Sequence, residues 1–173
     1  MDEMFDTYTR EGDYLGVRSK KECHSPDADF YHKPAWVWII NSKNELLVQK
    51  RAACKKVQPN KWDMPSAGHV DAGETPLEGA IRETEEELGL KTDASEYRFL
   101  GEFIEDSCRE IGQVFLLPCD LAAEEFVLQE DEVAAVKWLS FAEFKTLLYS
   151  DDFTPFGNGY KDWVVEQLEE AMK

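Results

Sequence analysis

The chain has 173 residues, a length typical of one domain, and its hydrophobic content of 43% is enough for a folded core. Its 36 acidic residues outnumber the 19 basic ones, which gives a formal net charge of −17 at pH 7. Such a charge repels a phosphate backbone and excludes a general nucleic-acid binder, whereas a small phosphorylated ligand can still be held through a divalent cation.

The cysteines and the N-terminal residues bear on the compartment. The four cysteines form no Cys-x-x-Cys pair, and the first residues lack the basic start and apolar stretch of a signal peptide. We therefore expect reduced thiols and a cytoplasmic protein. The longest wholly apolar run covers residues 35–40, far short of the roughly 20 residues of a transmembrane helix, so no membrane partner is expected.

The first half of the chain predicts mainly strands. Two short strands around a polar turn are expected within residues 5–17, as an N-terminal β-hairpin. A polar loop over 23–29 leads to the apolar run 35–40, which predicts a strand buried on both faces, with 46–50 as its neighbour. Residues 52–75 contain prolines and glycines without a sustained period and predict a long irregular loop, a kind of segment that is often functional.

The clearest helix is predicted over residues 76–88. Pro76 suits the first helical position, and Gly89 supplies the stop. The apolar positions recur at helical spacing, at Leu77, Ile81, Thr84 and Leu88. Further elements are predicted as strands over 99–104, 114–117 and 133–139, a helix from Ser140 to about Leu148 with a capping-box spacing, and a last helix over about 160–172.

Acidic residues are concentrated on the helix over 76–88. Glu83, Glu86 and Glu87 project into one sector, and the packing residues project into the opposite one, so one face is expected to pack while the other presents carboxylates. A solvated surface is the ordinary interpretation of such a face. Like charges at this spacing repel, however, and a hard divalent cation with oxygen ligands is the alternative interpretation.

The stretch from Gly68 to Leu90 reads Gly-x5-Glu-x7-Arg-Glu-Thr-x-Glu-Glu-x-Gly-Leu. It resembles the Nudix box, and the single departure is Thr84 at the first bulky aliphatic position. The resemblance implies an α+β fold, the α/β/α sandwich, with a Nudix-like mixed β-sheet flanked by helices. It implies a single Nudix hydrolase domain over 1–173, with a short N-terminal β-hairpin extension, and a MutT-like pyrophosphatase chemistry.

The resemblance also implies roles for individual residues. The implied ligands of Mg²⁺ or Mn²⁺ are the side chains of Glu83, Glu86 and Glu87 and the backbone carbonyl of Gly68. Glu74 and Arg82 would orient this site. A bound ion polarises a diphosphate and lowers the pKa of the attacking water. The catalytic base would be Glu86 or a carboxylate outside the box, for which Glu132 is our choice, although an ordinary acidic turn is an equal alternative there.

Outside the box, the sequence is similar to type I isopentenyl-diphosphate isomerases. The similar segments are His32-x-x-Ala35-Trp-x-Trp, Leu46-Leu-Val-Gln-Lys-Arg51-Ala, Lys55-Lys56-x-x-Pro59-x-x-Trp62, Gly68-His69 and Phe153-Thr-Pro155. This second resemblance would assign diphosphate binding to Arg51 and to Lys55 or Lys56, and exposed cations at a strand end are the plain alternative. Bidentate pairing makes Arg51 the better candidate.

Two positions argue against isomerisation itself. Ala67 stands where the isomerases place a catalytic cysteine, and alanine can neither donate nor accept a proton. Phe156 stands where they have a tryptophan that holds a carbocation, and phenylalanine is the weaker partner for a cation. The box also keeps the acidic pair Glu86-Glu87 that the isomerases usually lack.

The three histidines of the chain, His24, His32 and His69, fall at or near positions where the isomerases bind a second metal. Packed or surface histidines are the alternative. The acidic ligands expected downstream are not identified, because Ile111 and Gln113 occupy the equivalent positions. The sequence therefore leaves open whether these histidines form a second metal site.

The predicted function is Mg²⁺- or Mn²⁺-dependent hydrolysis of the diphosphate linkage in a nucleoside diphosphate derivative. An enzyme resembling isopentenyl-diphosphate isomerase and a non-catalytic module that senses a nucleotide are the alternatives. The expected partner is a small-molecule diphosphate substrate, without nucleic acid or membrane. A homodimer through the N-terminal hairpin and exposed aromatic residues is left open.

Overall fold

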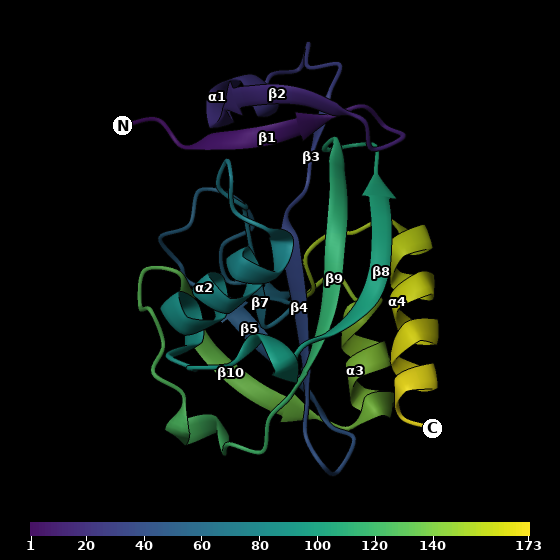
Figure 1. The fold of residues 1–173 in the computed structure, drawn as a ribbon. Coiled ribbons are helices and arrows are strands. Elements are labelled where there is room, and N and C mark those ends of the chain that lie inside the picture. The colour runs from purple at the N-terminus through teal and green to yellow at the C-terminus, as the bar shows by residue number, and fades with distance from the viewer.

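The computed structural model describes residues 1–173 as a mixed β-sheet with helices on both of its faces (Figure 1). The strands are β1 (Met4–Tyr8), β2 (Tyr14–Ser19), β3 (Tyr31–His32), β4 (Ala35–Ile40), β5 (Leu46–Arg51), β6 (Trp62–Asp63), β7 (Ser66–Gly68), β8 (Arg98–Glu105), β9 (Glu110–Pro118) and β10 (Val133–Leu139). The helices are α1 (Lys20–Cys23), α2 (Pro76–Leu88), α3 (Phe141–Leu148) and α4 (Asn158–Ala171), with 3₁₀ turns at Ala94–Glu96 and Ala123–Glu125.

The strand order is β10-β5-β4-β9-β3-β1-β2. Three further strands pair with members of this order: β6 with β5, β7 with β4 and β8 with β9. The central pair β4–β9 is parallel, from Ala35 opposite Gln113 to Ile40 opposite Pro118, whereas β4–β5 and β8–β9 are antiparallel. A parallel pair requires a long crossover connection, and here that connection includes α2. The predicted α+β class, a mixed sheet flanked by helices, is confirmed.

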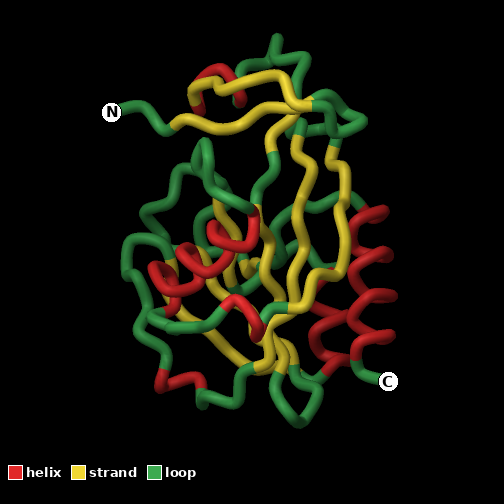
Figure 2. The backbone as a smooth tube through the Cα atoms, in the orientation of Figure 1, coloured by secondary structure: helices red, strands yellow, loops and turns green.

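Strand β4 separates two apolar cores. Successive side chains of a strand point to opposite faces, so Trp36, Trp38 and Ile40 pack with α3 and α4, while Ala35, Val37 and Ile39 pack with α2. All six residues are buried, as the continuous apolar run predicted. Figure 2 shows α2 and the α3–α4 pair on opposite sides of the sheet. The core therefore holds α2 firmly against β4 and β7.

Helix α2 has the bounds that its sequence predicted. The Thr75 side chain accepts a hydrogen bond from the Glu78 backbone N–H, and the Glu78 carboxylate accepts one from the Thr75 backbone N–H. This reciprocal pair is a capping box. Pro76 occupies the first turn, and Gly89 ends the helix with a φ of 63°, a left-handed conformation that glycine adopts without strain. Both ends of the helix are thus set by local residues.

The N-terminal residues form the predicted hairpin, with β1 and β2 antiparallel, and it lies across one end of the molecule (Figure 1). Helix α1 follows, capped by Ser19 and Glu22, and was not predicted. The hairpin joins the main sheet through two residue pairs between β1 and β3. Its own apolar cluster is small and consists of Phe5, Cys23, Ala28 and Phe30.

The prediction of a wholly irregular segment over 52–75 is wrong, because β6 and β7 lie within it. These strands have two and three residues and form by pairing with β5 and β4, so no periodic pattern marks them. Strand β3 was missed for the same reason. Strand β9 begins at Glu110, before the predicted start at 114, because its first residues pair with β8 and β3.

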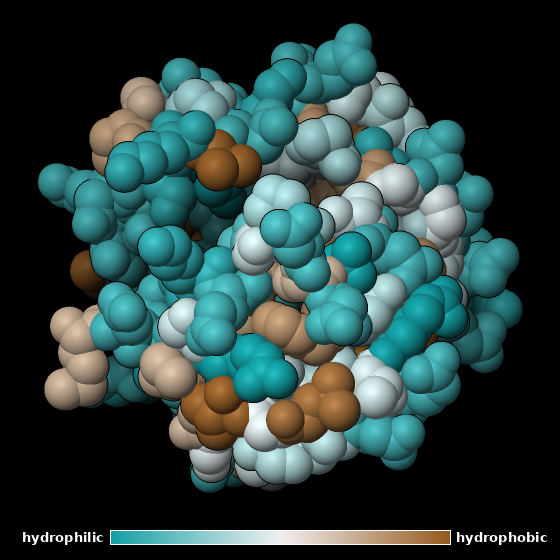
Figure 3. Space-filling model, turned by 90° about the horizontal axis from the view of Figure 1, so that it is seen from above, coloured by the Kyte–Doolittle hydropathy of each residue, from teal (hydrophilic) through white to brown (hydrophobic).

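The surface reflects the high charged content of 32%. The face drawn in Figure 3 is mainly hydrophilic, with apolar residues in small separate groups. No helix has both the length and the apolar character that crossing a bilayer requires.

Candidate active site

One cavity of about 570 Å³ brings together eight of the residues that the sequence assigned to the site, whereas Glu74 and Lys56 do not line it. Those residues are Arg51, Lys55, Gly68, Arg82, Glu83, Glu86, Glu87 and Glu132. They come from β5 and the loop after it, from β7, from α2 and from the turn before β10. The fold therefore places the acidic face of α2 opposite two cations and a further carboxylate.

Glu83, Glu86 and Glu87, here called the carboxylate cluster, differ in burial. The Glu86 side chain is 53% exposed, whereas Glu87 as a whole is only 7% exposed. Burial raises the pKa of Glu87 well above its usual value and also raises that of Glu83, and repulsion from neighbouring carboxylates adds to both effects. The expectation that the packed and acidic faces of α2 are separate is wrong for Glu87, because this side chain points toward β5.

Gln49 on β5 fixes the position of Glu87. Its amide nitrogen donates hydrogen bonds to Glu87 Oε2 at 3.0 Å and to the Pro65 carbonyl at 3.1 Å. Gln49 is itself buried. Sequence reasoning did not assign it a role, although a glutamine after Leu46-Leu-Val is the first polar residue of an apolar strand. A buried amide needs hydrogen-bond partners, and this requirement could have indicated that Gln49 contacts a polar residue of the site.

Arg82 connects three groups around the cluster. Its Nε and Nη2 donate to the two Glu74 carboxylate oxygens, each at 2.9 Å, and Nη1 donates to Glu83 Oε1 at 2.8 Å. Nη2 also donates to the His69 carbonyl at 3.0 Å. The hydrogen bond from Arg82 lowers the pKa of Glu74. Glu83 is thereby held by a cation on one side while its remaining oxygen is available to a ligand.

The two expected phosphate-binding cations already have partners. Arg51 Nη1 donates to Asp63 Oδ2 at 3.2 Å, and its Nε and Nη2 donate to the Val57 carbonyl at 3.2 and 3.0 Å. Two of its five N–H groups stay uncommitted. Lys55 forms an ion pair with Glu132. A phosphate in the cavity would therefore share these cations with Asp63 and Glu132.

The donors in the cavity fit a hard divalent cation. Eight acidic and only four basic side chains line it, so an anionic ligand is repelled unless a cation accompanies it. Carboxylate oxygens are the ligands that Mg²⁺ and Mn²⁺ prefer. A Cβ atom at position 68 would clash with the Glu83 side chain, so only glycine lets this carboxylate lie against β7. Glu83, Glu86 and Glu87 are the residues that could hold the ion.

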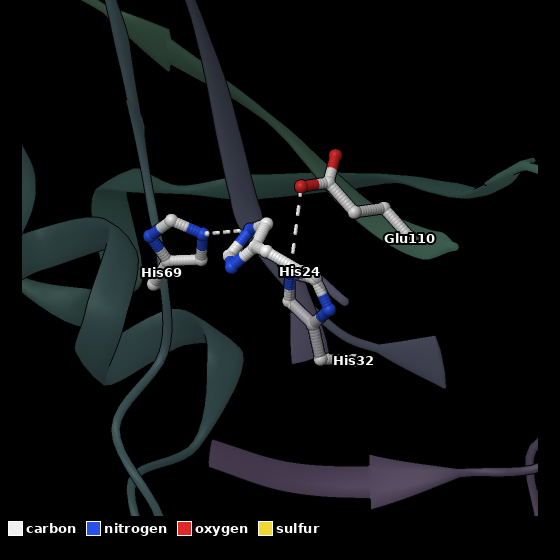
Figure 4. Close-up of side chains that lie close together, drawn as sticks. All are labelled: His24, His32, His69 and Glu110. Atoms are coloured by element: carbon white, nitrogen blue, oxygen red, sulfur yellow. Dashed lines mark hydrogen bonds and ion pairs between the residues drawn. The ribbon is translucent and has the colours of Figure 1, made fainter. Parts of the chain in front are cut away.

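The three histidines also converge, and a fourth residue joins them (Figure 4). Glu110, at the start of β9, lies one position before Ile111, the position at which the isomerase resemblance implies an acidic ligand. Ile111 is buried, and the Gln113 amide donates to Glu102 and to the Ile111 carbonyl. We call His24, His32, His69 and Glu110 the histidine cluster. His69 and Glu110 line the same cavity as the carboxylate cluster.

Comparisons of sequence place this site among known proteins. A family model described as the NUDIX domain matches residues 30–157. Nudix hydrolase 3 of Arabidopsis thaliana is 38% identical over 164 residues, a match that covers 87% of this chain but only 21% of the plant protein. The chain thus spans about a fifth of that relative. The uncharacterized Nudix hydrolase YfcD of Salmonella typhi is 36% identical over 153 residues, covering 88% of this chain and 79% of that protein.

Comparisons of structure agree in fold. DR0079 from Deinococcus radiodurans superposes with a TM-score of 0.76 at 20% identity, over 99% of this chain and 100% of that chain. An Ap4A hydrolase of C. elegans superposes with a TM-score of 0.54 at 18% identity, over 80% of this chain and 95% of that chain. The mixed sheet with its flanking helices is therefore shared with these proteins.

Proposed function

The chain belongs to the Nudix hydrolase family, and we propose that it cleaves a diphosphate linkage in a nucleoside diphosphate derivative with Mg²⁺ or Mn²⁺ as cofactor. Family membership supplies the broad class, a hydrolase of pyrophosphate bonds that uses a divalent metal ion. The substrate class, the ion and the residue roles given below are the proposal.

The observation that carries the proposal is the burial of acidic groups in one cavity. Glu87 is buried, Glu83 is largely covered, and each faces other carboxylates. Buried like charges are unfavourable unless a cation compensates them. A divalent ion bound here would polarise a diphosphate, offset its charge and lower the pKa of a coordinated water.

The remaining side chains position the reactants. Arg82 holds Glu83, and Gln49 holds Glu87, so two of the three carboxylates have fixed orientations. We assign the general base to Glu86, the most solvent-accessible member of the cluster, with Glu132 as the second candidate. The Glu132 carboxylate is paired with Lys55, and this pair would have to open before Glu132 could accept a proton from water. Lys55 and Arg51 would contact the phosphate oxygens.

Isomerisation is disfavoured by the same cavity. Ala67, which stands at the position of the isomerase cysteine, lines the cavity with a methyl group. No proton can be exchanged with substrate carbon at that position. Phe156 packs edge-on against Trp36, with ring centroids 5.8 Å apart. These contacts favour hydrolysis over an isomerase-like activity.

The compartment is part of the proposal. All four cysteines are unpaired in the structure, and Cys54 and Cys108 are exposed. Free exposed thiols persist in a reducing environment. We therefore place the enzyme in the cytoplasm, and a redox-sensitive reporter fused to the chain tests this placement.

A mass-spectrometric screen tests the activity. The purified protein, with Mg²⁺ or Mn²⁺, is offered nucleoside di- and triphosphates, nucleotide sugars, dinucleotides and isopentenyl diphosphate. Glu87→Gln is the inactive comparison, and Glu85→Gln is its matched control, because Glu85 lies on the same helix and carries the same charge but is outside the cavity.

Metal-dependent cleavage that is lost in Glu87→Gln and kept in Glu85→Gln supports the proposal, and the products name the bond. Tight binding across the panel without any product would support the nucleotide-sensing module instead. Conversion of isopentenyl diphosphate to its isomer would show that the absence of a cysteine at position 67 does not prevent isomerisation.

A further inference from the structure

Asp63 is a buried carboxylate that lines the same cavity as the carboxylate cluster. It lies on β6, beside the partly exposed side chain of Arg51 at the end of β5. In the pairing of β5 with β6, Asp63 stands opposite Gln49, the residue that holds Glu87. Asp63 is therefore next to the support of the carboxylate cluster and next to a proposed phosphate-binding cation.

The two oxygens of the Asp63 carboxylate have separate partners. Oδ1 accepts a hydrogen bond from the Met64 backbone N–H at 2.8 Å and another from the Thr154 hydroxyl at 3.0 Å. Oδ2 accepts one from Arg51 Nη1 at 3.2 Å. Because Oδ1 is held by two donors, the direction in which Oδ2 faces is fixed as well. The carboxylate therefore presents one oriented acceptor to the guanidinium.

The segment that carries Thr154 is itself attached to β6. The Thr154 backbone N–H donates to the Trp62 carbonyl at 2.8 Å, and the Trp62 N–H donates to the Asp152 carbonyl at 2.8 Å. Thr154 is buried, and its neighbour Phe153 belongs to the core cluster that packs with α3 and α4. These contacts tie the chain between α3 and α4 to the strand that bears Asp63. The Thr154 hydroxyl thus has a fixed position from which it holds Oδ1.

Asp63 and one backbone carbonyl set the plane of the Arg51 guanidinium. Nη1 donates to Asp63, while Nε and Nη2 donate to the Val57 carbonyl at 3.2 and 3.0 Å. The guanidinium is a planar, rigid fork, so partners on two of its edges fix its orientation. One N–H on Nη1 and one on Nη2 remain free, and these are the groups from which a phosphate can accept hydrogen bonds.

The burial of this ion pair indicates a role beyond stability. The cost of removing two charges from water can exceed their mutual attraction, so a buried pair contributes little net stability. A cation that must meet a phosphate from a defined direction benefits from such a pair, because its orientation is set before the ligand binds. One strand pair then supports both parts of the site, since Gln49 holds Glu87 and Asp63 holds Arg51.

We propose that Asp63 is a positioning residue that orients Arg51 toward the phosphate oxygens of the substrate, and that the Thr154 hydroxyl holds Asp63 in the required direction. This inference rests on the proposed function, because it takes a diphosphate as the group that Arg51 binds. Asp63 itself does not contact the phosphate, since two anions repel each other. Its effect is transmitted through Arg51.

The test measures diphosphate binding and does not depend on turnover. The full chain, at a fixed concentration of MgCl₂, is titrated with methylenediphosphonate, a diphosphate analogue whose P–C–P bridge is not hydrolysed, and calorimetry gives the dissociation constant. In Asp63→Asn the amide oxygen is required by the donors of Met64 and Thr154, so the NH₂ group faces Arg51 and the two donors repel. Thr154→Val removes the hydroxyl at nearly constant volume, and Thr154→Ser keeps it.

Asp106→Asn is the matched control. Asp106 also accepts hydrogen bonds from an arginine, Arg10, and from a hydroxyl, that of Tyr31, but it lies outside the cavity. Thermal unfolding and the binding of Mg²⁺ without the analogue show whether each variant keeps its fold and its carboxylate cluster.

We expect the dissociation constant for methylenediphosphonate to rise about tenfold in Asp63→Asn and about threefold in Thr154→Val. It should stay near the native value in Thr154→Ser and Asp106→Asn, and Mg²⁺ binding should be unchanged in all four variants. Arg51→Lys lacks the planar fork, so adding Asp63→Asn to it should cause little further loss of binding.

Two results would overturn this inference alone: an unchanged dissociation constant in Asp63→Asn, or losses from Asp63→Asn and Arg51→Lys that add fully. A native chain that does not bind the analogue with Mg²⁺ would overturn the proposed function as well. If Asp63→Asn does not fold, the two Thr154 variants still decide the question, since equal binding by Thr154→Val and Thr154→Ser would contradict the role of the hydroxyl.

Discussion

The carboxylate cluster and the histidine cluster lie at the same cavity but are built in opposite ways. Glu83, Glu86 and Glu87 share one turn of α2, carry negative charge and are held by a neighbouring cation, Arg82. The histidine cluster draws its members from four segments and lies against the ring of an aromatic residue, Phe5. One helix suffices to assemble the first set, whereas the second exists only when the hairpin has docked.

The two sets also differ in the ion that they fit. Carboxylate oxygens favour Mg²⁺ or Mn²⁺, and imidazole nitrogens favour Zn²⁺ and its neighbours. A single cavity therefore carries two sets of side chains with different ligand chemistry. The predictions below alter one set, or its support, and leave the other in place.

The largest effect is expected from the carboxylate cluster. Glu86→Gln and Glu87→Gln each remove a ligand or base, so kcat should fall about 100-fold or more. Steady-state kinetics with the substrate found in the screen measures this loss. Glu85→Gln should keep nearly full activity, because its carboxylate is half-exposed and lies outside the cavity. Equal losses in all three variants would indicate a general effect on α2.

Gly68→Ala tests the close approach of β7 and α2. The added methyl group clashes with Glu83, which must move, and a displacement of about 1 Å at a reacting centre can reduce turnover between about 10- and 100-fold. Activity and Mg²⁺ affinity should fall together. Gly159→Ala is the control, since a Cβ there makes only an ordinary contact of 3.7 Å with Phe103. Full activity in Gly68→Ala would contradict the fit of glycine to this site.

Gln49→Leu tests the support of Glu87. Burial already raises the pKa of Glu87, and the hydrogen bond from Gln49 opposes that rise. Removing this hydrogen bond should raise the pKa of Glu87 further. As the pH falls, Glu87 then becomes protonated, and loses the ionised form that binds a cation, at a higher pH than in the native chain. The acid limb of the activity profile should move to higher pH, and the apparent affinity for Mg²⁺ should fall about tenfold.

The double variant Gln49→Leu/Glu87→Gln checks this mechanism. If Gln49 acts through Glu87, its loss adds little once the carboxylate is gone. Additive losses would show that Gln49 has another role.

The smallest effect is expected at the outer edge of the hairpin. Hydrogen bonds from Arg10 and then Tyr31 lower the pKa of Asp106 from 3.8 to about 2. A lowered pKa stabilises the fold above about pH 4, and this contribution is lost as the pH falls toward 2. Asp106→Asn should therefore lower the Tm slightly at pH 7 and not at pH 2, as measured by calorimetry. Asp27→Asn, at an exposed residue of the loop after α1, should show no such pH dependence.

Local signals explain what the sequence predicted well. The bounds of α2 follow from Thr75, Pro76 and Gly89, which are adjacent to the helix, and the burial of β4 on both faces follows from its uninterrupted apolar run. The carboxylate cluster could be named because all its members lie within five consecutive residues of one helix.

Non-local contacts explain the rest. Strands β6 and β7 exist through their pairing with β5 and β4, which no short pattern encodes. Glu87 is buried because β5 supplies Gln49 opposite it. Glu110 could not be matched to His32 from sequence, since the two become neighbours only through the parallel pairing of β3 with β9. Each of these features depends on segments far apart in the chain.

The peptide that joins Gly68 to His69 connects the two clusters. Gly68 lies against Glu83, the His69 side chain faces the histidine cluster, and Arg82 donates both to the His69 carbonyl and to Glu83. A shift of this peptide would therefore move groups in both clusters. Linkage then requires reciprocity: whatever factor a ligand bound at one cluster applies to binding at the other, the second ligand applies in return.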